Sequence, residues 1–312
     1  MRAFLFPGQG SQAVGMGAAL AEASQAARDT FAEVDEALGQ NLFRLMREGP
    51  EEELKLTENA QPAIMANSLA VFAALTKEGG VDFAKAANFV AGHSLGEYSA
   101  LAAAGSFDLP TTAKLLKLRG QAMQRAVPVG QGAMAALLGA DLELARRIAE
   151  AAARGEVCTV ANDNDPTQVV LSGHKGAIDR VVEIAKEMGA KRAIPLPVSA
   201  PFHCPLMQPA AEAMRDALSY VMVGDPVVPV FANVTAQPES DPDTIRNLLV
   251  EQVTGMVRWR ESVANMGEAG VEEFVELGGK VLGTMVKRIL PDVKVTSVVS
   301  IEDLEALAKE IA

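Results

Sequence analysis

The chain has 312 residues, of which 49% are hydrophobic and 4% aromatic, and its mean hydropathy is +0.14. This composition is that of an Ala-, Val- and Leu-rich α/β protein and argues against a disordered or an all-β chain. The formal net charge of −12 argues against a nucleic-acid or anionic-membrane partner, because binding to phosphates needs a surplus of Lys and Arg.

The apolar runs are far shorter than the roughly 20 residues that a membrane helix requires, and the N-terminus lacks a signal-peptide pattern. We therefore expect a cytoplasmic protein with no membrane partner. Two cysteines, Cys158 and Cys204, are too few for a disulfide framework. Neither has a metal-ligand spacing with a histidine, so no structural metal is expected.

In chain order, the first predicted element is a buried strand, residues 3–6, followed by a glycine-rich loop that contains "GQG" at 8–10. Residues 16–38 predict a long helix and residues 57–80 a second helix that ends at two glycines. Residues 86–92 predict a strand and residues 97–105 a helix, so "GHSLG", residues 92–96, falls between a strand and a helix.

Residues 132–195 change in character. Strands are predicted at 132–139, 156–163, 167–173 and 190–197, with helices at 141–155 and 174–189. The order β-α-β-β-α-β is that of a ferredoxin-like unit, and Pro/Gly-containing hinges flank it. We therefore predict a small domain, residues 129–196, inserted into a large domain that residues 1–128 and 197–312 form.

After the insertion, a helix is predicted to follow the loop that begins at residue 201, and strands at 227–235, 271–278 and 294–300. Helices at 242–255, 259–270, 280–290 and 301–312 lie between or after these strands. Because strands and helices alternate, the fold class is α/β, with a mainly parallel sheet covered on both faces.

Ser94 is the candidate nucleophile, because a G-x-S-x-G pattern between a strand and a helix forms a nucleophile elbow. A serine needs a base within hydrogen-bond reach. His93 is its sequence neighbour, whose side chain points away on an elbow, and His174 belongs to the inserted domain. His203, where the chain re-enters the large domain, is the best base; the alternative is a histidine in a surface loop.

An acyl-transfer site also needs N–H donors for the developing oxyanion. The amide of Leu95 follows the nucleophile, and the "GQG" loop can supply a second donor. That loop nearly matches a dinucleotide-binding fingerprint, but Asp29 and Glu33, the acidic residues at the required distance, fall inside a predicted helix. Met16 stands where a phosphate-binding Walker loop needs lysine, which excludes that motif.

Arg119 shares a helix face with Leu115, Leu116 and Met123. A guanidinium on an apolar face is costly unless it meets an anion, and its geometry fits a carboxylate, so its partner could be a substrate. The alternatives are an internal salt bridge or a side chain that extends to solvent.

The segments "FPGQGSQ", "GHSLGEYSAL", "LRGQAM", "VAN", "VSAPFH" and "LLVEQV" occur in this order over nearly the whole chain. In this the sequence resembles the malonyl-CoA:acyl carrier protein transacylases of fatty-acid synthesis. The resemblance implies a large α/β-hydrolase-like domain with a small ferredoxin-like insertion, which agrees with the division above.

The resemblance further implies roles for residues. Ser94 would be acylated by malonyl-CoA, His203 would be the general base and acid, and Arg119 would bind the free malonyl carboxylate. The main-chain carbonyl of Gln252 would orient the imidazole in place of an acidic residue. The remaining residues that the resemblance assigns are Gln9 and Leu95, whose amides form the oxyanion hole, and Met123, Asn162 and Phe202, which bind substrate.

Leu95 and Phe202 are also similar to the residues of malonyl-selective members, since bulk beside the acyl α-carbon leaves no room for a methyl branch. The implied reaction is ping-pong: malonyl-CoA acylates the serine, and the thiol of acyl carrier protein then takes the acyl group. No metal or bound cofactor is needed. Lys280, Lys287 and Arg288 are candidates for a basic surface that docks the acidic carrier protein.

Two other classes of function stay open at this point. A serine hydrolase or thioesterase would use the same elbow with Asp163 or Asp165 as its acid. A non-catalytic nucleotide- or CoA-binding module would need no nucleophile at all.

Overall fold

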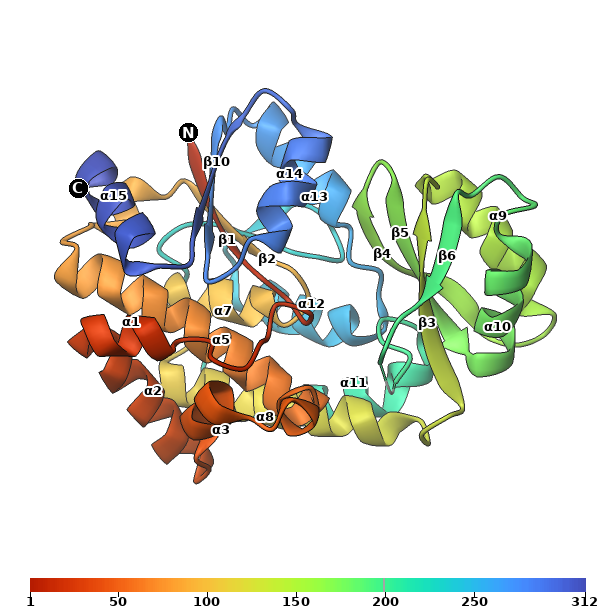
Figure 1. The fold of residues 1–312 in the computed structure, drawn as a ribbon, viewed down its shortest axis with the longest axis horizontal. Coiled ribbons are helices and arrows are strands. Elements are labelled where there is room, and N and C mark those ends of the chain that lie inside the picture. The colour runs from red at the N-terminus through yellow and green to blue at the C-terminus, as the bar shows by residue number, and fades with distance from the viewer. Residues whose placement is uncertain (199) are drawn as a thin grey trace.

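The computed structural model describes residues 1–198 and 200–312, so that Ser199 of the "VSAPFH" segment lies outside the described residues. These residues form two separate sheets (Figure 1). The larger sheet has the strand order β10-β9-β1-β2-β7-β8, and all its strand pairs are parallel except β7 with β8. Its strands are β1 (Arg2–Phe6), β2 (Phe89–Gly92), β7 (Val230–Phe231), β8 (Pro238–Glu239), β9 (Glu273–Leu277) and β10 (Lys294–Val298).

The smaller sheet is antiparallel, with the order β4-β5-β3-β6. Two helices, α9 (Leu142–Ala153) and α10 (Lys175–Ile184), pack their apolar side chains on one face of it and enclose a separate core. This topology confirms the predicted ferredoxin-like order of elements. The strands are β3 (Gly132–Leu138), β4 (Cys158–Asp165), β5 (Gln168–His174) and β6 (Arg192–Pro195).

Helices cover both faces of the larger sheet, as its buried, parallel strands require. Side chains alternate along β1: Phe4 and Phe6 face one core, and Ala3 and Leu5 face the other. The helices are α1 (Ala18–Ala23), α2 (Gln25–Leu38), α3 (Leu42–Glu48), α4 (Glu51–Leu54), α5 (Thr57–Ala73), the π-helical turn η1 (Ala74–Glu78), α6 (Phe83–Ala86), α7 (Gly96–Ala103), α8 (Leu109–Ala126), the 3₁₀ turn η2 (Pro205–Met207), α11 (Gln208–Ser219), α12 (Pro242–Thr254), α13 (Trp259–Glu268), α14 (Val281–Ile289) and α15 (Ile301–Ile311).

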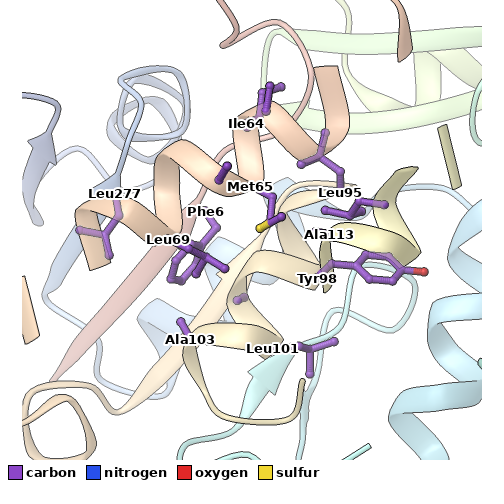
Figure 2. Packing of buried hydrophobic residues seen from close by; sticks show 14 of the residues in the cluster. Phe6, Ile64, Met65, Leu69, Leu95, Tyr98, Leu101, Ala103, Ala113 and Leu277 are labelled. Carbon is purple, nitrogen blue, oxygen red and sulfur yellow. The ribbon is translucent and has the colours of Figure 1, made fainter. Parts of the chain in front are cut away.

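The larger core lies where α5 and α7 meet the sheet. Figure 2 shows Met65 and Leu69 of α5 close to Phe6 of β1, with Tyr98 and Leu101 of α7 beside them. The helix α5 has an unusually uniform burial, because the sheet packs on one of its sides and α2 and α8 on others. Because α5 is buried, its polar side chains can form hydrogen bonds with one another and with the neighbouring helices rather than with solvent.

Two predicted elements were wrong in extent. The helix expected at 16–38 is two helices, because Ser24 has an extended backbone and its hydroxyl caps α2 by accepting from the N–H of Ala27. The strand expected at 227–235 contains only the two residues of β7. No described helix is both long and apolar enough to cross a membrane.

Candidate active site

Ser94 lies in the turn between β2 and α7, so the predicted strand–turn–helix setting is confirmed. Its φ of 54° is in the left-handed region, which is rare for residues other than glycine. The flanking glycines have a steric cause: a Cβ on Gly92 would lie 1.9 Å from the backbone of Gly96, and one on Gly96 would lie 2.2 Å from the carbonyl oxygen of Phe6. The pattern G-x-S-x-G therefore allows this turn to pack tightly on the end of the sheet.

His203 is in contact with the serine. Its Nε2 lies 2.7 Å from Oγ of Ser94, and its Nδ1 lies 2.8 Å from the main-chain oxygen of Gln252. A carbonyl can only accept, so Nδ1 carries the proton and Nε2 is free to accept the proton of the hydroxyl. Burial and the nearby Arg119 guanidinium lower the pKa of His203 to about 3. The imidazole is therefore a neutral base at physiological pH.

The acid that a Ser-Asp-His hydrolase needs is not supplied by the two aspartates considered for it. Both are buried in β4, where Asp163 is 2.8 Å from the guanidinium of Arg260 and Asp165 is 2.9 Å from that of Arg288. Their carboxylates are thus bound to arginines, and the imidazole of His203 is oriented by a neutral carbonyl instead.

The other two histidines have different contacts. Nε2 of His93 lies 2.8 Å from Oδ1 of Asn164, and its ring packs against that of Trp259. His174 ends β5 of the smaller sheet and precedes α10, and its Nδ1 accepts from the N–H of Val157. Of the three histidines, only His203 contacts the hydroxyl of Ser94.

Arg119 is buried beside the nucleophile, with 1% of its surface exposed, so its side chain does not extend to solvent. It donates to Oε1 of Gln61 at 2.8 Å, to Oε1 of Gln252 at 2.8 Å and to Oγ of Ser94 at 3.1 Å. Its carbon Cζ lies 5.7 Å from the ring centroid of Tyr98, and its Nε has no partner among the described residues. Within that part of the chain it forms no salt bridge, so a buried cation faces only neutral acceptors.

The position of Arg119 relative to Ser94 depends on how closely α8 and α5 pack. A Cβ on Gly120 would lie 2.6 Å from Cα of Glu58 and from the carbonyl oxygen of Thr57. The absence of a side chain at Gly120 therefore lets the two backbones touch. This close contact places the amide of Gln61, one turn further along α5, within reach of the guanidinium.

A buried polar network, which we did not predict from the sequence, holds the turn that contains Ser94. Asn233 accepts from the N–H of Ser94 at 2.8 Å and donates to the carbonyl of Gly92 at 2.7 Å. The side-chain amide of Gln252 donates to the carbonyl of Ser94 at 3.0 Å and to Oε2 of Glu97 at 2.8 Å. Burial raises the pKa of Glu97 to about 7. The available signal was a set of polar residues inside otherwise apolar segments.

A cavity of about 250 Å³ opens above Ser94. Gln9 and Leu95 line it, and the backbone N–H of neither residue donates a hydrogen bond within the described part of the chain. Asn162 also lines it, from strand β4, within the segment that we expected to be a strand. The lining also includes the two other expected substrate residues, Met123 and Phe202, together with His93, Gln61, Met134, Leu196, Val198 and, toward the surface, Gln12 and Lys55.

The three basic residues considered for carrier-protein docking lie together at α14, in a separate surface groove. Lys287 donates to the carbonyl oxygen of Pro291 at 3.1 Å, and Arg288 pairs with Asp165. Lys280 alone of the three has no such bond among the described residues. Docking at this surface stays a prediction.

The family model, the related proteins and the solved structures that match this chain all point to the same family. A family model described as an acyl transferase domain matches residues 3–297. The malonyl CoA-acyl carrier protein transacylase of Escherichia coli (strain K12) is 46% identical over 289 residues, or 92% of each chain. The protein of the same name from Bacillus subtilis (strain 168) is 45% identical over 305 residues, 97% of this chain and 95% of the relative.

Solved structures agree with these relatives. The acyl-carrier-protein-S-malonyltransferase of Bartonella henselae superposes with a TM-score of 0.97 at 51% identity, over 99% of each chain. A malonyl-transacylase solved in complex with a type II polyketide synthase acyl-carrier protein superposes with a TM-score of 0.95 at 41% identity, again over 99% of each chain.

Proposed function

We propose that this chain, which belongs to the malonyl-CoA:acyl carrier protein transacylases of the acyl transferase domain family, moves the malonyl group through an ester on Ser94. Its substrates are malonyl-CoA and acyl carrier protein, and the reaction supplies fatty-acid synthesis. The observation that carries the assignment of residues is the placement of a neutral base, His203, and a buried cation, Arg119, on the same hydroxyl oxygen.

In the first half-reaction, Nε2 of His203 removes the proton of Ser94 as Oγ attacks the thioester carbonyl of malonyl-CoA. The carbonyl oxygen becomes an oxyanion, which the amides of Gln9 and Leu95 stabilise. The tetrahedral intermediate then collapses, the C–S bond breaks, and the CoA sulfur leaves with the proton from the imidazolium. The products are free CoA and malonyl-Ser94.

In the second half-reaction, the phosphopantetheine thiol of acyl carrier protein gives its proton to His203 and attacks the ester carbonyl. The same two amides stabilise the second oxyanion, and Ser94 leaves with the proton. The carbonyl of Gln252 fixes the imidazole tautomer throughout but adds no negative charge. The imidazolium is therefore a short-lived strong acid, which favours rapid protonation of each leaving group.

Arg119 selects the acyl group. The guanidinium is desolvated, and a carboxylate can form charge-assisted hydrogen bonds with it that neutral amides cannot match. The malonyl carboxylate therefore replaces Oγ of Ser94, and part of the amide contacts, as a partner of Arg119. Phe202 and Leu95 limit the space near the acyl α-carbon, and Met123 and Asn162 line the remainder.

Hydrolysis by the same elbow is the competing function. It is disfavoured because the two candidate acids are bound to arginines and because apolar side chains, among them Met134, Leu196 and Phe202, line the cavity and limit access of water. A binding module without catalysis is disfavoured by the hydrogen-bonded Ser94 and His203. We expect the enzyme to act in the cytoplasm and to need no bound cofactor.

The test is to incubate the protein with malonyl-CoA and weigh it intact, with Ser94→Ala as the control. We expect one malonyl adduct, mapped to Ser94, and its discharge when acyl carrier protein is added. Rapid release of malonate without an adduct would support a hydrolase instead. An unmodified protein that releases no CoA would support a binding module.

A further inference from the structure

Glu97 is a buried carboxyl group that the mechanism above does not use. It lies in the first turn of α7, three residues after the nucleophile, and only 2% of its surface is exposed. Its Oε2 accepts from the backbone N–H of Asn233 at 3.0 Å and from Nε2 of Gln252 at 2.8 Å. It does not line the cavity, so it is placed behind the site and not in contact with substrate.

The contacts of Gln252 show what Glu97 can control. The side-chain amide of Gln252 has its oxygen toward Arg119 and its nitrogen toward Glu97 and the carbonyl of Ser94. If the amide turned over, its NH₂ would face the N–H groups of the guanidinium, and its oxygen would face a carboxylate and a carbonyl. An ionised carboxylate only accepts hydrogen bonds, so it permits one orientation of the amide.

We propose that Glu97 is a positioning residue for substrate selection, which fixes the Gln252 amide so that its oxygen holds the Arg119 guanidinium in reach of the substrate carboxylate. This inference rests on the proposed function, because it concerns the use of malonyl rather than uncharged acyl groups. It assigns Glu97 no contact with the reacting atoms.

The position of Gln252 between the Glu97 carboxylate and the Arg119 guanidinium supports this role. A carboxylate bound directly to Arg119 would occupy the N–H groups that a malonyl carboxylate needs. With Gln252 between them, Glu97 places a negative charge near the buried cation and leaves Nε and part of the fork available. One side chain therefore stabilises the charge of Arg119 without competing with the substrate.

Two titratable groups face Glu97: Arg119 from α8 and Tyr98 from α7 itself. Of the other elements that pack on α7, strands β2 and β7 contain no charged residue, Arg2 of β1 pairs with Glu273, and Glu58 of α5 pairs with Lys117. Burial outweighs the hydrogen bonds and the attraction to Arg119, so the pKa of Glu97 rises to about 7. The carboxylate form, which makes the stronger hydrogen bonds, therefore increases between about pH 6 and about pH 8.

The experiment compares kcat/KM for malonyl-CoA with that for acetyl-CoA across this pH range. The ratio of the two values cancels effects that are common to both thioesters, including those of His203 and of partial unfolding. Glu97→Ala removes the acceptor, and Glu97→Gln keeps an acceptor but removes the ionisation. Asp35→Asn is the matched control, because Asp35 also has a burial-raised pKa and also accepts from a backbone N–H, that of Phe43, far from the cavity.

We expect Glu97→Ala to lower the malonyl-to-acetyl ratio about tenfold to hundredfold, the loss of a hydrogen bond to a charged group. In the unaltered enzyme the ratio rises with pH through about 7, and in Glu97→Gln it stays close to the low-pH value of the unaltered enzyme and shows no such rise. Asp35→Asn leaves both the ratio and its pH dependence unchanged.

Equal losses for both thioesters in Glu97→Ala, or a pH dependence that persists in Glu97→Gln, would overturn the proposal. If Glu97→Ala does not fold, the pH profile of Glu97→Gln decides alone. Intact-mass measurement separates this outcome from failure of the proposed function: an unaltered enzyme that forms malonyl-Ser94 but shows no effect of Glu97 refutes only the positioning role.

Discussion

The two walls of the active-site cavity are built in different ways. The wall on the side of the larger sheet carries Ser94 and Arg119, whose polar groups are bonded to each other and to Gln252 across elements that are far apart in sequence. The wall on the side of the smaller sheet contributes mainly apolar surface, such as Met134 of β3 and Leu196 after β6. The polar groups that carry out the reaction therefore lie on one wall, and most of the apolar groups that bound the acyl group lie on the other. Substitutions on the two walls should have effects of different size and kind.

The largest effect is expected from Ser94→Ala. Without the nucleophile no acyl-enzyme can form, and transfer should fall by about 10³-fold or more, to whatever rate oriented binding alone supports. Transfer to the carrier-protein thiol can be followed by mass spectrometry. Substantial residual transfer with a malonyl adduct on another residue would contradict the assignment of the first wall.

Arg119→Ala should have the next largest effect, and a selective one. Use of malonyl-CoA should fall about 10²-fold, because a charge-assisted contact with the substrate carboxylate is lost, while use of acetyl-CoA changes much less. The measurement is kcat/KM for each thioester with the same carrier protein. Equal losses would mean that Arg119 stabilises the fold or positions Ser94 and does not bind the substrate carboxylate.

A pH experiment tests the buried state of His203. Its pKa falls from 6.5 to about 3 on folding, so the unfolded chain binds more protons between these values and stability is lost as pH falls. From about pH 6.5 to about pH 5, the loss should be about 2 kcal/mol. Glu97, with its raised pKa, changes stability in the opposite direction.

Because the two groups oppose each other, the histidine is isolated by comparison with His203→Gln in chemical denaturation at each pH. The difference in unfolding free energy between the two proteins should shrink as pH falls. Parallel pH dependences would show that His203 is not desolvated as the geometry indicates.

The smallest effect is expected on the second wall. Met134→Ala widens the cavity beside the acyl group but leaves the hydrogen bonds of Ser94 and His203 intact. Transfer of malonyl should change by less than about tenfold, while discrimination against a methyl-branched acyl group falls, since a methyl group is worth about 1–3 kcal/mol in a pocket. The test is competition between malonyl-CoA and methylmalonyl-CoA. A loss as large as that of Arg119→Ala would remove the contrast between the walls.

The elements that sequence predicted well are those with a strong local pattern. The elbow around Ser94 depends on glycines within five residues, and the six-element insertion depends on short alternating segments, so both were recognisable without tertiary information. The extents of α1, α2 and β7 were harder, because a single capping hydroxyl at Ser24 or the pairing with β8 decides them.

The polar network was not predictable in the same way. Gln61 comes from α5, Glu97 from α7 and Asn233 from the turn after β7, and their bonds depend on the register at which these segments pack. A helical period says which face is buried but not which polar atom it meets. For Arg119, the pattern left open a substrate anion, an internal salt bridge or extension to solvent, and the structure shows a buried guanidinium that donates to neutral acceptors.

The close contact of α8 and α5 at Gly120 affects which acyl groups the enzyme could come to accept. With the two backbones this close, the Cα of Arg119 can move relative to α5 only if a whole helix shifts. The length of an acceptable diacid then depends on the spacing between two helices as well as on the conformation of one long side chain. Acceptance of a longer dicarboxylic acyl group is therefore expected to need a change in helix packing in addition to substitutions in the cavity lining.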